Sequence, residues 1–376
     1  MRQVARGAAA VASPCDLAPS WVRAIAPYQP GKPISELGRE LALDPASIVK
    51  LASNENPLGA SPRGLAAAQA ALAETARYPD GAGFELKVAL AAKHDVPAEC
   101  LVLGNGSNDV LDMVARAFLA PGSSSVYAQH AFAVYPIASQ TVGAAGIEVP
   151  ARNHGHDLDA MLSAIRDDTR VLWIANPNNP TGTFVAGEIV CAFLARVPPH
   201  VVVVLDEAYN EYLPSELQFD SVSWIAAHPN LIVTRTFSKA YGLAGFRVGY
   251  AVADPALADL LNRVRQPFNV NHAGQAAARA ALDDREFIAL SVETNAKGMA
   301  QLEAGFRDRG LEFIPSHGNF VSVRVGDGAR VFQSLLRQGV IVRPVANYGM
   351  PEYVRVSVGL EPENRRFLST LDKALQ

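Results

Sequence analysis

The stretch TRTFSKAYGLAGFRVGY, residues 234–250, decides how this chain is organised. It follows a short apolar run at residues 231–233, so Lys239 comes where a buried strand would end. An unpaired buried ammonium is costly, and burial lowers the pKa of a lysine amine and makes it a good imine-forming nucleophile. Arg247, further along this glycine-rich segment, adds a fixed cation that suits a phosphate. For this stretch alone, a surface lysine in a loop is an equally good interpretation.

Length, charge and cysteine content narrow the class of protein. The 376 residues predict one large domain and a second, smaller one. A formal net charge of −4 gives no basic excess to attract nucleic acid or an anionic membrane, and no apolar run approaches the roughly 20 residues of a membrane span. Three widely spaced cysteines suggest neither a disulfide framework nor a zinc site. We expect a reduced, cytoplasmic protein with no metal site.

Short apolar runs alternate with helical patterns through the middle of the chain. Strands are expected at 101–103, 125–127, 171–174, 201–205 and 231–233, and helices at 34–41, 63–76, 84–94, 109–118, 133–141 and 187–196. This alternation predicts an α/β fold with a mostly parallel sheet covered on both faces. Right-handed crossovers bring the loops after the strands to one edge of such a sheet, where ligands bind.

The pattern changes after about residue 271 to that of a smaller α+β domain. We expect one long helical region over 273–309, strands at 320–325, 340–343 and 353–358, and helices at 329–338 and 362–375. The predicted organisation is a disordered arm over 1–20, an arm over 21–58 that packs with the small domain, a large domain over 59–270 and a small domain over 271–376. Residues 1–15 are too short and too weakly apolar for a secretory signal.

Three loops after the expected strands carry polar residues. Gly104–Asp109 opens a helix and offers free N–H groups to an anion, although an ordinary glycine turn is the alternative. Prolines fix the asparagines of Asn176–Gly182 in defined directions. Asp206 ends an apolar strand and needs a cationic partner or several hydrogen bonds; a pyridinium nitrogen is one such partner, and a structural cap is the alternative.

Three further side chains are weaker candidates. Phe132 ends a strand and can stack on a flat cofactor, although such an aromatic is more often part of the core. Arg343 and Arg355 lie on short strands of the small domain, where either can clamp a carboxylate or a phosphate. Each arginine, taken alone, is more often a surface ion pair. A reactive lysine, a phosphate-binding arginine and a buried aspartate are together what pyridoxal phosphate requires.

Four motifs in this order and spacing resemble the fold-type-I pyridoxal-phosphate enzymes of the aspartate aminotransferase superfamily. They are NPTG (179–182), DEAY (206–209), TFSK (236–239) and Arg247. Within the superfamily the chain is most similar to histidinol-phosphate aminotransferases, through APYQPG (26–31), LASNENP (51–57), RYP (77–79) and YVRVSVG (353–359). The resemblance covers nearly the whole chain from about residue 21. It implies a large domain with a mostly parallel seven-stranded sheet between helices, and a smaller α+β domain.

The resemblance implies a role for each matched residue. Lys239 would join the cofactor and shuttle the proton, Asp206 would pair with the ring nitrogen, and Tyr209 would hydrogen-bond the ring oxygen. The remaining cofactor contacts would come from Ser107, Asn108, Phe132, Asn179, Thr236, Ser238 and Arg247, and from Tyr78 of the other subunit of a homodimer. Substrate-binding residues would be Tyr28, Asn54, Arg343 and Arg355.

The expected activity is transfer of an amino group from L-histidinol phosphate to 2-oxoglutarate, in ping-pong fashion through pyridoxamine phosphate. The chain departs from the commoner sequence of the family at HAF (130–132) and at SND (107–109), and both changes keep the roles that the resemblance implies. An aromatic-amino-acid aminotransferase and a threonine-phosphate decarboxylase are the alternatives on this fold. A cofactor-sensing transcription regulator would need a DNA-binding domain ahead of residue 21, which that short segment is not expected to supply.

Overall fold

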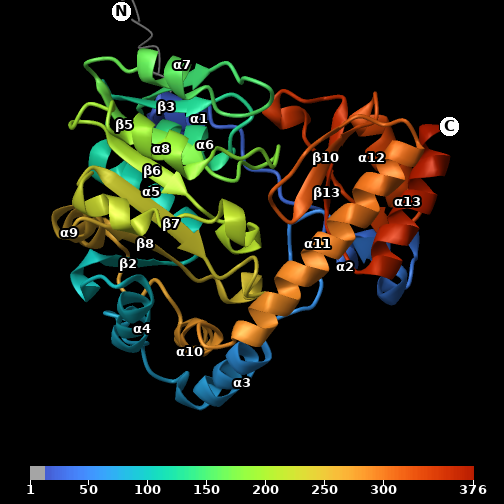
Figure 1. Cartoon of the computed structure of the whole chain (residues 1–376), viewed down its shortest axis with the longest axis horizontal. Coiled ribbons are helices and arrows are strands. Elements are labelled where there is room, and N and C mark those ends of the chain that lie inside the picture. The colour runs from blue at the N-terminus through green and yellow to red at the C-terminus, as the bar shows by residue number, and fades with distance from the viewer. Residues whose placement is uncertain (1–12) are drawn as a thin grey trace, which may run out of the picture.

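The computed structural model describes residues 13–376, so the arm expected over 1–20 lies mostly outside the described residues. Figure 1 shows two lobes, with the large sheet in one and the C-terminal helices in the other. The large lobe contains a seven-stranded sheet in the order β2-β8-β7-β6-β5-β3-β4. These strands are β2 (Leu101–Gly104), β3 (Ser124–Ala128), β4 (Ala145–Val149), β5 (Thr169–Ala175), β6 (Val202–Asp206), β7 (Leu231–Thr236) and β8 (Gly249–Ala253).

The sheet is parallel from β4 through to β7, and β8 runs antiparallel to both of its neighbours, β7 and β2. Every residue of β6 and β7 is buried, and the apolar runs within them, at 202–205 and 231–233, fit a sheet that is covered on both faces. The mostly parallel seven-stranded sheet predicted from sequence is therefore confirmed. The parallel strands end at one edge, which carries the loops after β5, β6 and β7.

Helices bury their apolar stripes against this sheet. α5 (Ser107–Phe118) contacts β2, β7 and β8, and it also packs against α6 (Val134–Thr141) and α9 (Pro255–Val264). α7 (Leu158–Ser163) contacts β3, and α8 (Gly187–Leu194) adds buried side chains to the same core. At the lower end of Figure 1, α10 (His272–Ala281) packs against α3 (Pro62–Ala71) and α4 (Phe84–His94).

The single long helical region expected over 273–309 is wrong, because the chain forms two helices there. α10 ends at Ala281, and α11 runs over Arg285–Asp308. Asp284, between them, is buried, and its carboxylate accepts hydrogen bonds from Ser61 Oγ at 2.6 Å and from the Arg63 N–H at 3.4 Å. Aspartate has a low propensity for helix interiors, and the Asp284 carboxylate instead forms hydrogen bonds with the start of α3.

The small lobe has its own sheet and its own hydrophobic core. β9 (Phe313–Ile314), β10 (Phe320–Arg324), β12 (Arg343–Pro344) and β13 (Tyr353–Ser357) form an antiparallel sheet in the order β12-β13-β10-β9. α12 (Gly328–Arg337), α13 (Glu361–Leu375) and the C-terminal half of α11 bury apolar side chains in this core. The domain boundary after residue 270 stays a prediction; α10 contributes to the large core, and the small core takes residues of α11 from Met299 onward.

The N-terminal arm contacts both lobes. α1 (Ser20–Arg23) lies on α6, where Gln140 Nε2 donates to the Trp21 carbonyl at 3.1 Å. α2 (Ile34–Leu41) packs its buried Leu37 with side chains of the small lobe, and β1 (Val49–Lys50) pairs in parallel with β11 (Val340–Ile341). The segment between α1 and α2 thus passes from one lobe to the other. Within residues 13–376, no helix combines the length and the apolar character needed to cross a membrane.

Candidate active site

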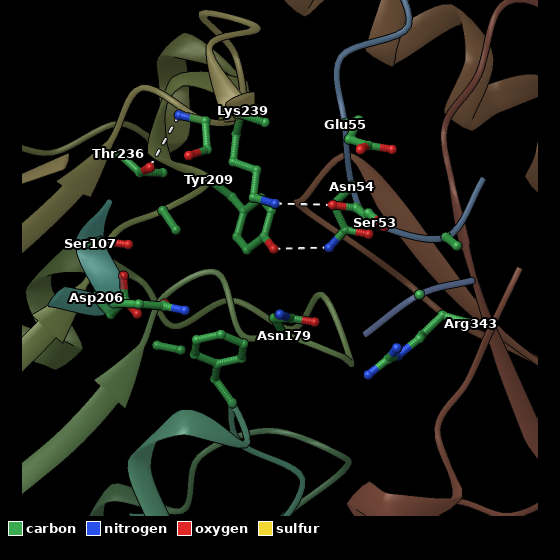
Figure 2. Close-up of a pocket in the computed structure, with 18 of the residues that line it drawn as sticks. Ser53, Asn54, Glu55, Ser107, Asn179, Asp206, Tyr209, Thr236, Lys239 and Arg343 are labelled. Carbon is green, nitrogen blue, oxygen red and sulfur yellow. Dashed lines mark hydrogen bonds between the residues drawn. The ribbon is translucent and has the colours of Figure 1, made fainter. Parts of the chain in front are cut away.

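A cavity of about 400 Å³ lies where the loops after β5, β6 and β7 face the small lobe and the arm. Figure 2 shows side chains from both lobes pointing into it. The cavity gathers fourteen of the fifteen site residues predicted from sequence: Tyr28, Asn54, Ser107, Asn108, Phe132, Asn179, Asp206, Tyr209, Thr236, Ser238, Lys239, Arg247, Arg343 and Arg355. Residues separated by more than 300 positions therefore share one chamber.

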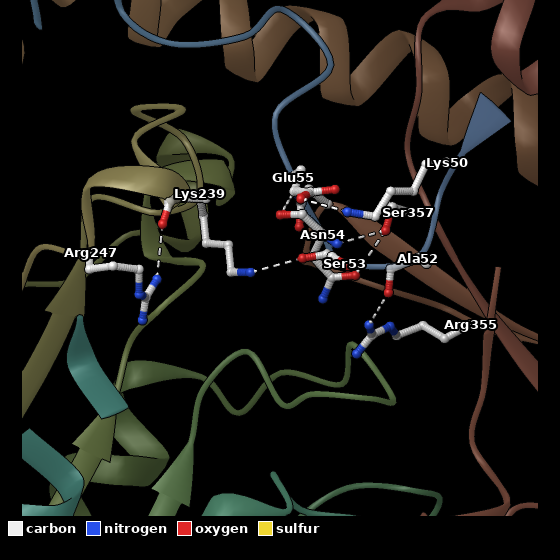
Figure 3. Close-up of polar contacts among 11 residues, drawn as sticks. Lys50, Ala52, Ser53, Asn54, Glu55, Lys239, Arg247, Arg355 and Ser357 are labelled. Atoms are coloured by element: carbon white, nitrogen blue, oxygen red, sulfur yellow. Dashed lines mark hydrogen bonds and ion pairs between the residues drawn. The ribbon is translucent and has the colours of Figure 1, made fainter. Parts of the chain in front are cut away.

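Lys239 follows β7 and extends its amine into the cavity. Its Nζ donates to the Ser53 carbonyl at 3.2 Å, a contact between the large lobe and the N-terminal arm that Figure 3 shows. Burial, with a further contribution from the nearby Arg355 guanidinium, lowers the pKa of Lys239 to about 8. An amine with this pKa is partly neutral near neutral pH, as a nucleophile or a base requires.

Asp206 ends β6, and its side chain is only 4% exposed. Tyr135 Oη donates to Asp206 Oδ2 at 2.9 Å, and Thr234 Oγ1 donates to Asp206 Oδ1 at 3.1 Å. Burial raises the pKa of Asp206 to about 6, although both hydrogen bonds favour the ionised form. No cationic side chain pairs with this carboxylate among residues 13–376, so a cationic ligand atom would complete its environment.

A concentration of hydrogen-bond donors lies at the N-terminus of α5. The N–H groups of Ser107 and Asn108 have no acceptor within the helix, whereas the Asp109 N–H donates to the Gly106 carbonyl at 3.2 Å. A Cβ on Gly106, which has a φ of +80°, would lie 2.3 Å from Arg247 Nη2, so the guanidinium packs directly on this turn. Arg247 Nη1 donates to Ser238 Oγ at 3.4 Å, and the Ser238 N–H donates to Thr236 Oγ1 at 3.1 Å. A helix N-terminus, two hydroxyls and an arginine together suit a phosphate.

Asn54 joins Tyr209 to the small lobe. Its Nδ2 donates to Tyr209 Oη at 2.9 Å, so the phenolic proton is left to be donated elsewhere. The Asn54 N–H donates to Ser357 Oγ at 2.8 Å, the Ser357 hydroxyl donates to Asn54 Oδ1 at 3.0 Å, and Asn319 Nδ2 donates to the Asn54 carbonyl at 3.0 Å. Asn54 is 1% exposed and has a φ of +54°, a left-handed conformation that asparagine tolerates better than most residues.

Two arginines at paired positions of β12 and β13 face the cavity from the small lobe. Arg355 Nη1 donates to Asn179 Oδ1 at 2.5 Å and Nη2 donates to the Ala52 carbonyl at 2.8 Å, while Nε is buried without an acceptor. Arg343 Nη2 donates to the Gln29 carbonyl of the arm. Both arginines are 6% exposed, and neither has a carboxylate partner among residues 13–376. The pair therefore suits an anionic group of a substrate.

Tyr78 is the one predicted site residue outside the cavity. Its ring is 82% exposed and stacks on Phe268, with 4.7 Å between the ring centroids. Sequence reasoning also missed Tyr135 and Thr234, the two hydroxyl donors to Asp206. Neither carried a distinguishing signal, because an aromatic in a helix and a threonine in a strand are ordinary core residues.

The residues of the cavity fit pyridoxal phosphate. The donors around Arg247 suit its phosphate, Asp206 lacks a cationic partner that a protonated ring nitrogen would supply, and Lys239 has the lowered pKa of an amine that attacks an aldehyde. Phe132 lines the same cavity and meets Tyr135 edge to face, with 5.8 Å between centroids.

The fold and this cavity are those of an aminotransferase, and the chain belongs to the family aminotransferase class I and II, which matches residues 46–371. Among known proteins it is similar to histidinol-phosphate aminotransferase 1 of Thiobacillus denitrificans, with 64% identity over 95% of this chain and 93% of the relative. It is 60% identical to histidinol-phosphate aminotransferase 2 of Nitrosospira multiformis, over 96% of this chain and 93% of the relative.

Solved structures agree with this family. The histidinol-phosphate aminotransferase of Sinorhizobium meliloti, in complex with pyridoxal-5′-phosphate, superimposes with a TM-score of 0.87 at 27% identity. The match covers 95% of this chain and 96% of that chain. The fold-type-I α/β architecture expected from the motifs is thereby confirmed.

Proposed function

We propose that this protein is a pyridoxal-phosphate-dependent transaminase that converts L-histidinol phosphate and 2-oxoglutarate to imidazole-acetol phosphate and L-glutamate. The observation that carries the proposal is the convergence of Lys239, Asp206 and an anion-binding arginine pair on one cavity. The curated relatives at 60–64% identity, which are histidinol-phosphate aminotransferases, favour this substrate over an aromatic amino acid or threonine phosphate.

On the cofactor side of the cavity, three residues of this chain have expected roles in the reaction. Pyridoxal phosphate bound there would supply the aldehyde that takes up the amino group and the ring that delocalises the electron pair left by the α-proton. Lys239 would remove that proton and return it to the former aldehyde carbon of the cofactor, across the transferred nitrogen, since about half of its amine is neutral near pH 8. Asp206 would hold the ring nitrogen protonated. Tyr209 would donate to the ring oxygen, because Asn54 already occupies its acceptor side.

The substrate side of the cavity is suited to binding anions. Arg355 would bind the carboxylate of glutamate or 2-oxoglutarate in one half-reaction and the phosphate of histidinol phosphate in the other. Arg343 and Tyr28 lie beside it, with the Arg343 guanidinium carbon 5.4 Å from the Tyr28 ring centroid. One anion site that serves both substrates fits a ping-pong reaction, in which they bind one after the other.

The active unit in this proposal is a cytoplasmic homodimer. Tyr78 would reach the cofactor phosphate of a second subunit, which accounts for its large exposure on a single chain. Phe268, which stacks on Tyr78, is itself 44% exposed, so the two rings offer a small apolar surface to a second subunit. The three cysteines are free, which is compatible with a reducing compartment. Light scattering after gel filtration would give the mass of a dimer, and a monomer with full activity would contradict the shared site.

An absorbance half-reaction tests the proposed substrate. Protein loaded with pyridoxal phosphate is mixed with L-histidinol phosphate, with phenylalanine or with threonine phosphate, and no keto acid is added. Fast conversion of the cofactor to its amino form by histidinol phosphate, and slow conversion by phenylalanine, is the expected result. The reverse order would make the protein an aromatic aminotransferase, and CO2 release from threonine phosphate would make it a decarboxylase. The Lys239→Ala variant is the control and should be inactive with each compound.

A further inference from the structure

The carboxylate of Asp206 is held by two hydroxyls from different elements. Thr234 stands directly opposite Asp206 in the pairing of β7 with β6, and its Oγ1 reaches Oδ1. Tyr135 comes from α6, on a different side, and its Oη reaches Oδ2. Each oxygen of the carboxylate therefore accepts one hydroxyl proton and keeps a lone pair for a further partner.

The Tyr135 ring cannot turn away from this contact. It is 0% exposed and lies parallel to the indole of Trp173, with 5.3 Å between ring centroids and 6° between planes. Phe132, which lines the cofactor side of the cavity, meets the same ring edge to face at 86°. Tyr135 thus touches both the aromatic wall of the cavity and the carboxylate that ends β6.

We propose that Tyr135 is a positioning residue: together with Thr234 it fixes Asp206 as an ionised acceptor aimed at the cofactor's ring nitrogen. This inference rests on the proposed function. A protonated carboxyl group would use one oxygen as a donor, but both oxygens already face hydroxyls that can supply protons to them. The two hydroxyls therefore favour the charged form of Asp206, which in turn favours a protonated ring.

The test compares two forms of the cofactor on cofactor-free protein. One is pyridoxal phosphate, and the other is its analogue with the ring nitrogen replaced by C–H, which cannot pair with Asp206. Equilibrium dissociation constants are measured by fluorescence for the wild type and for Tyr135→Phe. A hydrogen bond to a charged group corresponds to a change of roughly 10- to 100-fold in an equilibrium constant. We expect Tyr135→Phe to raise the dissociation constant of pyridoxal phosphate by about tenfold or more, and that of the analogue by less than about twofold.

Tyr250→Phe is the matched control. Tyr250 lies on β8 outside the cavity and is also buried, and its hydroxyl hydrogen-bonds His94 Nε2 at 2.8 Å. This variant loses a buried hydroxyl of the same kind and should show a similar fall in thermal stability. Its ratio of dissociation constants for the two cofactors should equal that of the wild type. Thr234→Val removes the other donor and should change the ratio in the same direction as Tyr135→Phe.

The outcomes separate this inference from the function on which it rests. If Tyr135→Phe and Thr234→Val weaken the binding of pyridoxal phosphate more than that of the analogue, the positioning role is supported. Equal losses with both cofactors, or a loss no larger than that of Tyr250→Phe, would overturn it while leaving the transaminase intact. A wild-type protein that binds neither cofactor would overturn the proposed function as well.

Discussion

Asn54 connects the cofactor side of the cavity to the small lobe, so its replacement tests the site most directly. Asn54→Gly removes two side-chain hydrogen bonds, one to Tyr209 Oη at 2.9 Å and one from Ser357 Oγ at 3.0 Å. At about 0.5–1.5 kcal/mol net for each bond, the free energy of unfolding should fall by about 1–3 kcal/mol. Asn54→Ala loses the same bonds and must also adopt a φ near +54° with a Cβ.

The difference between these two variants isolates the backbone. The left-handed conformation costs a non-glycine residue roughly 1–2 kcal/mol, and the greater freedom of glycine in the unfolded chain offsets about 0.4–1 kcal/mol of that. Alanine should therefore be about 0.5–1 kcal/mol less stable than glycine in urea unfolding of the cofactor-free protein. Glycine and alanine variants of equal stability would refute the backbone argument.

The same variants should also slow the reaction, because Tyr209 loses the donor that orients its hydroxyl. Stopped-flow half-reactions with histidinol phosphate and with glutamate should both slow by about tenfold, the equivalent of about 1.4 kcal/mol. Tyr209 is placed on the cofactor side, so both amino donors should be affected alike. Slowing with only one donor would mean that Asn54 acts on that substrate and not through Tyr209.

Three further predictions concern charged groups. Arg355→Ala should raise KM for both substrates by about 10- to 100-fold, since each loses a charge-assisted contact; steady-state kinetics in which only one KM rises would indicate two separate anion sites. Because the Lys239 amine is protonated below its pKa of about 8, capture of pyridoxal phosphate by cofactor-free protein should accelerate with pH up to about 8 and then level off, whereas a rate still rising at pH 10 would mean an ordinary lysine pKa. Glu207→Gln should lower unfolding stability by up to about 3–5 kcal/mol, because buried Arg235 loses the carboxylate that it contacts at 2.7 Å and keeps only the more distant charge of Glu211; a Glu207→Gln protein as stable as Arg235→Met/Glu207→Leu in urea would contradict this.

Much of the fold could be predicted because the central strands are apolar on both faces. β5, β6 and β7 each contain an uninterrupted apolar run, at 171–175, 202–205 and 231–233, and such a run indicates a buried strand. β4 could not be found in this way: it is an edge strand, four of its five residues are at least partly exposed, and it contains Gly146 and Glu148. The break between α10 and α11 was missed because the partner of Asp284 lies at Ser61, far away in sequence.

The residues of the candidate site likewise fall into those that local sequence indicates and those that only tertiary packing explains. Lys239, Asp206 and Arg247 could be located because each follows or precedes a buried strand, where a charged group requires an explanation. Tyr135 gave no such signal, since its hydroxyl is explained only by the carboxylate that tertiary packing brings to it. Tyr78 was named through family resemblance, and on one chain it remains an exposed ring stacked on Phe268.

The N-terminal arm has a mechanical consequence for the cavity. Its two ends are fixed on different lobes, α1 on α6 and α2 on the small lobe, so residues 24–33 form a tether of limited length. Fully extended, this segment spans at most about 33–36 Å. Three prolines within it restrict the backbone and reduce its slack further. Tyr28 and Gln29 lie on the tether, so any separation of the lobes that draws it taut also moves the groups that contact Arg343. The same ten residues therefore connect the two lobes and place Tyr28 and Gln29 against Arg343.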